Sequence, residues 1–89
     1  MINIDKKTWR EIDKEIARHL VQIRKRRKIS QQVLSKRADV SLGTLKRFEQ
    51  TGEISLKSLT KLANALEVED ELETLFAEVP FQSIEEILN

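Results

Sequence analysis

Residues 29–52 of this 89-residue chain read ISQQVLSKRADVSLGTLKRFEQTG, which predicts two short helices joined by a tight turn. Ser30 is placed to cap a short helix to about position 37, and Ser41 is placed to cap a second helix to about position 50. Ala38-Asp39-Val40 leaves only a tight connector between the two helices. Gly52 stands where a left-handed C-terminal cap is expected. The side chains expected to point inward are Val33, Leu34, Leu45 and Phe48.

Three further helices are predicted around this pair. The first spans about 9–27 and opens on a capping box formed by Thr8 and Glu11, and the others span about 55–66 and 69–77. Each carries apolar residues at spacings of three and four, the period of an amphipathic helix. These residues are Trp9, Ile12, Ile16, Leu20 and Ile23 in the first, Leu56, Leu59, Leu62, Ala63 and Leu66 in the second, and Leu72, Leu75 and Phe76 in the third.

The predicted fold class is all-α, with five helices in one domain over 1–78 and a short acidic-apolar tail over 79–89. No segment alternates apolar and polar residues over a convincing strand length, and Pro80 ends the helical pattern. Isolated helices this short are marginal in water, so packing of their apolar stripes has to stabilise them. The most buried side chains should include Leu20, Leu34, Leu45, Phe48, Leu59 and Leu62.

The composition excludes several kinds of chemistry. There is no cysteine and only one histidine, His19, so a disulfide framework, a thiolate zinc site and a Cys nucleophile are excluded. No glycine-rich loop could cradle a phosphate, so neither an enzyme nor a bound cofactor or metal is expected. No apolar run reaches the ~18–20 residues of a membrane span, and MINIDKKTW lacks the apolar stretch of a signal peptide, so we expect a cytoplasmic protein.

The near-neutral net charge conceals a strong asymmetry along the chain. Residues 1–50 hold 14 Lys and Arg against 6 Asp and Glu, a balance of +8, whereas residues 51–89 hold 2 against 9, a balance of −7. Such a division favours one face that meets a polyanion, although ordinary solvated surface charge is an equally good explanation of the charge alone.

A helix, a three-residue turn and a second helix give the spacing by which one helix braces another against a DNA major groove. The chain resembles the lambda-repressor/Cro-like (XRE-type) helix-turn-helix family over 18–67, with the motif itself at 30–50. The matching residues are Arg24, Ser30-Gln31, Leu34, Ala38-x-Val40-Ser41, Thr44-Leu45, Phe48-Glu49 and Gly52.

The resemblance implies a set of DNA contacts. Gln31, Ser41 and Thr44 match positions that touch the sugar-phosphate backbone, and Leu42, Gly43, Lys46 and Arg47 match positions that face base edges. The helix N-termini at Ser30-Gln31 and Ser41 can each hold a phosphate through unpaired N–H groups, and Lys28 in the preceding loop is a plausible phosphate neighbour. Arg47 is the better candidate for a bidentate contact with guanine, and Leu42 could pack on a thymine methyl.

The sequence departs from the family pattern at three positions. Leu42 and Gly43 stand where repressors often place Gln, Arg or Asn, so direct readout is expected to be thin and operator shape more important. Gly43 either lets the backbone lie close to DNA or loosens the helix by chance. Asp39 replaces the usual turn glycine, which its tolerance of left-handed backbone permits.

Arg24 opens a run of five basic residues, 24–28, that helical spacing spreads around more than one turn, so these side chains cannot all point to DNA. Arg24 aligns with the family arginine that pairs internally with a glutamate near the end of the second helix of the motif, here Glu49. We favour this structural ion pair over a DNA contact for Arg24.

Residues 62–89 contain eight acidic residues and no basic one, yet remain rich in apolar side chains. They either close a two-fold dimer or dock on a basic partner protein, with a segment in the tail formed by Phe81, Ile84, Ile87 and Leu88. An acidic-apolar tail behind such a domain resembles antitoxins found beside HipA-like kinase toxins.

The predicted function is therefore a sequence-specific DNA-binding transcriptional regulator, a homodimeric autorepressor on a palindromic operator of double-stranded DNA, with the antitoxin of a HipA-like toxin as a special case of this function. The alternatives are a stand-alone phage-type repressor and a protein-interaction module that has lost DNA binding.

Overall fold

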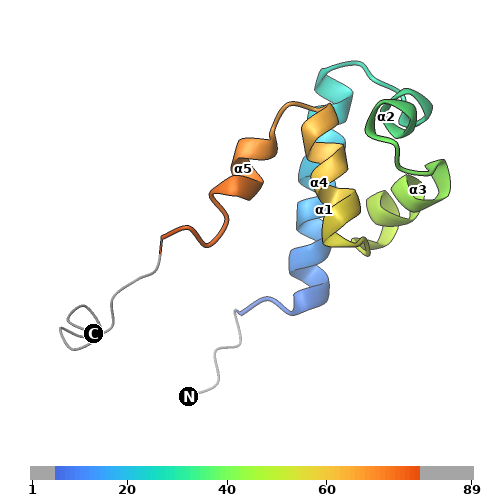
Figure 1. Cartoon of the computed structure of the whole chain (residues 1–89). Coiled ribbons are helices and arrows are strands. Elements are labelled where there is room, and N and C mark those ends of the chain that lie inside the picture. Colours follow the sequence, from blue (N-terminus) through green and yellow to red (C-terminus); the bar gives the residue numbers. More distant parts are fainter. Residues whose placement is uncertain (1–5, 79–89) are drawn as a thin grey trace.

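The computed structural model describes residues 6–78, which form five α-helices and no strand (Figure 1). The all-α prediction is thereby confirmed for this part of the chain. The helices are α1 (Trp9–Arg26), α2 (Gln31–Ala38), α3 (Leu42–Thr51), α4 (Leu56–Ala65) and α5 (Glu69–Glu73).

The first four helices begin at hydroxyl caps. The side chains of Thr8, Ser30, Ser41 and Ser55 each accept a hydrogen bond from the backbone N–H three residues further on, at donor–acceptor distances of 3.1–3.2 Å. Each cap satisfies one of the N–H groups that a helix start leaves without an intrahelical partner. The caps predicted at Thr8, Ser30 and Ser41 are confirmed, and Ser55 caps α4 in the same way.

Left-handed residues end these helices. Lys28, Asp39 and Glu67 have φ of 55–59°, and in each case the next residue donates its N–H to a carbonyl five positions back. Those bonds are Ile29 N to Arg24 O at 3.2 Å, Val40 N to Ser35 O at 3.0 Å and Val68 N to Ala63 O at 2.9 Å. This is the 6→1 bond of a Schellman cap, made here without glycine. Gly52 (φ 83°) ends α3 as expected.

The core lies where α1, α2, α3 and α4 meet. α1 packs on α3, α2 packs on both α3 and α4, and α5 packs on α4. The largest fully buried side chains are Phe48, Leu34, Leu45, Leu62 and Leu66, and burial of each stabilises the fold by about 1.5–3 kcal/mol. Leu20 is also buried, whereas Leu59 is only partly buried and packs on the edge of this cluster.

Several apolar residues expected to face the core are exposed instead. Trp9, Ile12 and Ile16 are 60%, 46% and 43% exposed, because the core reaches α1 only from Ala17 onward. Val33 is also exposed, because the eight residues of α2 present one narrow face of Leu34, Ser35 and Ala38 to the core. Leu56 is exposed at the first position of α4.

The prediction of a helix over 69–77 is wrong in its length. α5 ends at Glu73, and beyond its cap the chain turns through a left-handed Phe76 with φ of 60°. Leu75 and Phe76 are consequently exposed rather than inward. The tail residues Phe81, Ile84, Ile87 and Leu88 lie outside the described residues.

The two glycines should respond to alanine in opposite directions. A Cβ on Gly52 would lie 2.7 Å from the backbone carbonyl carbon of Asp13 in α1, and its φ is unfavourable for alanine, so Gly52→Ala should cost about 2–4 kcal/mol of unfolding free energy. A Cβ on Gly43 meets nothing within 4 Å, so Gly43→Ala should stabilise the helix by about 0.5–1 kcal/mol. Urea denaturation of both variants checks this, and equal effects would contradict it.

Candidate nucleic-acid interface

α3 has one apolar side and one exposed polar side. Leu45 and Phe48 are 0% and 1% exposed and hold the helix against the core. Gly43, Lys46 and Arg47 are exposed at spacings of three and four, which places them on one stripe of the opposite side. Two other residues of the predicted interface, Leu42 and Thr44, are partly buried at the flanks of this stripe.

Gln50 continues the exposed stripe one turn further, seven residues after Gly43. It lines a shallow pocket together with Gln31, Lys46 and Glu49. Glutamine can form a bidentate pair with adenine, so Gln50 adds a group that can hydrogen-bond a base edge to this surface. The sequence analysis did not select this residue. The spacing of seven was the signal that could have identified it.

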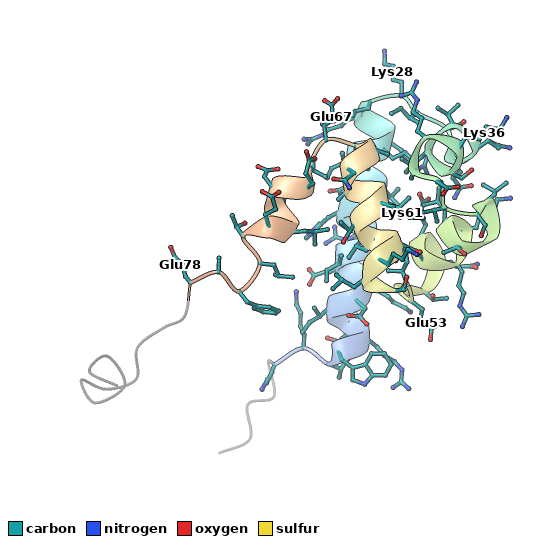
Figure 2. The ribbon with its side chains drawn as sticks, viewed as in Figure 1. Lys28, Lys36, Glu53, Lys61, Glu67 and Glu78 are labelled. Atoms are coloured by element: carbon teal, nitrogen blue, oxygen red, sulfur yellow. The ribbon has the colours of Figure 1, made fainter. Side chains whose placement is uncertain are left out.

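The N-termini of α2 and α3 lie beside this stripe. Ser30 and Ser41 are exposed, and the Ser41 hydroxyl also donates to Thr44 Oγ1 at 2.8 Å while it accepts from the Thr44 N–H. One serine satisfies only one of the orphan N–H groups of a helix start, so the remaining donors and the partial positive charge suit an anion. The Lys28 side chain points away from the body of the protein in the loop before α2 (Figure 2).

A buried ion pair ties α3 to α1. Arg24 Nε donates to Glu49 Oε2 at 2.8 Å and Arg24 Nη2 donates to Glu49 Oε1 at 2.9 Å, with the two side chains 10% and 9% exposed. Arg24 Nη1 also donates to the Ile29 carbonyl at 3.0 Å. Such a fork-on-fork arrangement is strong and directional. Arg24 therefore lies inside the fold and not on the exposed side of α3.

Gln31 joins α2 to the same carboxylate. Its Nε2 donates to Glu49 Oε1 at 2.9 Å, so this partly buried side chain turns toward the ion pair. An amide nitrogen carries a second hydrogen, so this contact leaves one donor for another acceptor. Glu49 consequently joins α1, α2 and α3 at one point.

Arg47 also has a carboxylate partner, but an exposed one. Its Nη2 and Nε lie 2.6 and 3.1 Å from Glu53 Oε2, and the two side chains are 69% and 53% exposed. Arg47, one of the two cations on the exposed stripe of α3, is thus held by the Glu53 carboxylate.

The charges are separated in space as well as in sequence. α2 and α3 lie on one side of the molecule, and α5 lies on the other, beyond α4 (Figure 1). α5 carries Glu69, Asp70, Glu71 and Glu73 and no cation. Such a field orients an approaching polyanion toward the side of α2 and α3.

Among residues 6–78, no group of three or more His, Cys, Asp or Glu side chains could hold a metal ion. No helix described there is both long and apolar enough to span a bilayer.

Comparison with known proteins agrees with this geometry. The sequence model of the helix-turn-helix family, in its lambda-repressor-like (XRE-type) form, matches residues 20–72. No curated protein matches the chain. Because the match covers more than half of the sequence, the chain belongs to this helix-turn-helix family, and the family resemblance predicted from the sequence is confirmed. The protein is therefore a DNA-binding regulator of transcription.

Removing one partner of the buried ion pair should destabilise the fold strongly. Arg24→Met leaves the buried Glu49 carboxylate without a counter-charge, and Glu49→Leu does the same to the buried Arg24 guanidinium, at a cost of about 3–5 kcal/mol each. The double variant should cost less than the sum, because no unpaired charge remains. Arg47→Met, which breaks an exposed pair, should cost under about 1 kcal/mol. Additive single effects in urea denaturation would contradict this account.

Proposed function

We propose that the protein is a sequence-specific regulator that inserts α3 into the major groove of its operator. The observation that carries the proposal is the division of α3 into a buried apolar side and an exposed stripe that contains the two cations Lys46 and Arg47. A major groove admits a helix with its side chains, and arginine or lysine can pair with guanine there. The N-termini of α2 and α3, with their partial positive charge, attract the phosphates that flank the bases being read.

Base reading in this proposal falls to few side chains. Arg47 and Lys46 donate to base edges, Leu42 contacts a thymine methyl, and Gly43 allows close approach, since nothing stands within 4 Å of its Cβ position. With only two donors among these four residues, operator shape contributes a larger share of the selectivity.

The proposed backbone contacts surround this stripe and fix its register on the duplex. They are Lys28, Ser30, Gln31, Ser41 and Thr44, which include the caps and first turns of both helices. A helix N-terminus with a hydroxyl cap is a suitable place for a phosphate oxygen. Such contacts position the protein without reading sequence.

We further propose a homodimer on a palindromic operator upstream of its own gene, in the cytoplasm. One ten-residue helix supplies little specific contact, and two-fold partners read half-sites about 34 Å apart. Three exposed apolar side chains that line one pocket between α4 and the segment after α5 support association there, namely Leu56, Leu75 and Phe76.

An antitoxin role is a second candidate that is compatible with DNA binding. The exposed apolar residues after α5 follow directly on its acidic surface, a combination that suits a basic partner protein such as a HipA-like kinase. The tail segment of Phe81, Ile84, Ile87 and Leu88 would extend this contact.

DNA binding can be tested on the upstream region of the gene with purified full-length protein. Arg47→Ala should relax selectivity at one base pair per half-site, worth about 1–3 kcal/mol, whereas Lys28→Ala should weaken binding to all sequences and reduce the salt slope by about 1. Arg18→Ala on α1 removes the same charge outside the proposed interface and serves as the control. If the Arg47→Ala and Lys46→Ala variants bind as the native protein does, the interface is wrong and an interaction module is favoured.

The partner proposals have separate readouts. Light scattering should give a dimer mass, and Leu75→Ser with Phe76→Ser should lower it toward the monomer if that surface forms the contact. Deleting residues 80–89 should leave operator binding intact and abolish co-purification with the product of the adjacent reading frame. Retention of that partner by the truncated chain, or an adjacent gene that encodes no kinase-like protein, would contradict the antitoxin role.

A further inference from the structure

We propose that Glu53 determines how selectively the protein distinguishes its operator from other DNA, by acting as a positioning residue for Arg47. This inference rests on the proposed function, because it concerns the arginine that is proposed to read bases. It adds a residue that lies outside α3 and that the family motif does not assign.

The contact itself has a defined geometry. Both Arg47 bonds go to one oxygen, Glu53 Oε2, from Nη2 at 2.6 Å and from Nε at 3.1 Å. One edge of the planar guanidinium is therefore occupied by the carboxylate. The second edge, which contains Nη1, carries further donors that can form a bidentate pair with another group.

Glu53 is held in place by its backbone. The Thr51 hydroxyl donates to the Arg47 carbonyl at 2.7 Å, and the Glu53 N–H donates to the Thr51 hydroxyl oxygen at 3.1 Å. Between these residues Gly52 turns in a left-handed conformation against the backbone of Asp13, where no Cβ would fit. The ring of contacts from Arg47 through Thr51 to Glu53 and back fixes the carboxylate relative to the end of α3. Figure 2 shows Glu53 just beyond the end of α3.

Two physical effects follow for a duplex bound at α3. A long arginine side chain loses rotamer freedom when it docks on a base, and a carboxylate that already holds one edge reduces that loss for the correct base. A fixed negative charge beside Arg47 also competes with phosphates for the same guanidinium. The first effect favours the operator and the second disfavours non-operator DNA, which is bound mainly through phosphates. Removing the carboxylate therefore lowers selectivity through both effects.

The decisive test compares Glu53→Gln with the native protein on operator and non-operator duplexes over a range of salt concentrations. The non-operator affinity should rise by up to about fivefold, the range expected for release of one exposed ion pair, while operator affinity stays equal or falls. The slope of log affinity against log salt on non-operator DNA should steepen by about 0.9, because Arg47 gains a phosphate contact. A purely structural role of Glu53 would not change that slope.

Two matched variants complete the experiment. Glu73→Gln on α5 makes the same change in net charge on the opposite side of the protein and should leave the operator/non-operator ratio unchanged. Thr51→Val removes the hydroxyl that anchors the Glu53 backbone and should lower the ratio in the same direction as Glu53→Gln. In an Arg47→Ala background, Glu53→Gln should have no further effect on the ratio.

The outcomes separate this inference from the proposed function. If the native protein selects its operator and Glu53→Gln leaves both the ratio and the salt slope unchanged, the role of Glu53 is refuted while DNA reading stands. The same refutation follows if Glu73→Gln changes the ratio as much as Glu53→Gln does, because net charge alone would then be responsible. If the native protein prefers no duplex, the proposed function itself fails.

Discussion

The position of α3 depends on the carboxylate of Glu49. Apolar burial holds α3 against α1 and α2, but it is non-directional and allows a helix to slide or rotate. The bonds from Arg24 and Gln31 to Glu49 have fixed lengths and angles, and they join α1, α2 and α3 at one buried point. A rotation of α3 that turned Lys46 inward would break all three bonds. The polar network therefore defines which side of α3 faces solvent.

The inner and outer residues of α3 have different roles. Its inner residues, Leu45 and Phe48, contribute to stability, and its outer residues are free of packing constraints. The two arginines illustrate the difference. Arg24 has a buried partner and forms part of the fold, whereas Arg47 has an exposed partner that a competing anion can displace at small cost. One type of ion pair thus stabilises the fold at one position, and at the other it holds the arginine that we propose reads bases.

Sequence reasoning predicted the helices well where local signals were strong. Hydroxyl caps located the starts of α1, α2 and α3, the apolar period located α4, and the alignment of Arg24 with Glu49 anticipated their contact. The prediction of burial was wrong at Ile12 and Ile16. Periodicity shows which side of a helix is apolar, but it does not show how far along the helix other elements cover that side. Sequence reasoning also missed the bonds from Gln31 to Glu49 and from Arg47 to Glu53, since these depend on the relative placement of helix ends and turns.

An NMR titration of the isotope-labelled protein with a duplex from the upstream region of its gene tests directly whether the exposed side of α3 meets DNA. We expect the largest amide shift changes at the N-termini of α2 and α3 and along Gly43, Lys46, Arg47 and Gln50, with α5 unaffected. Changes confined to α5, or none with any duplex, would contradict it.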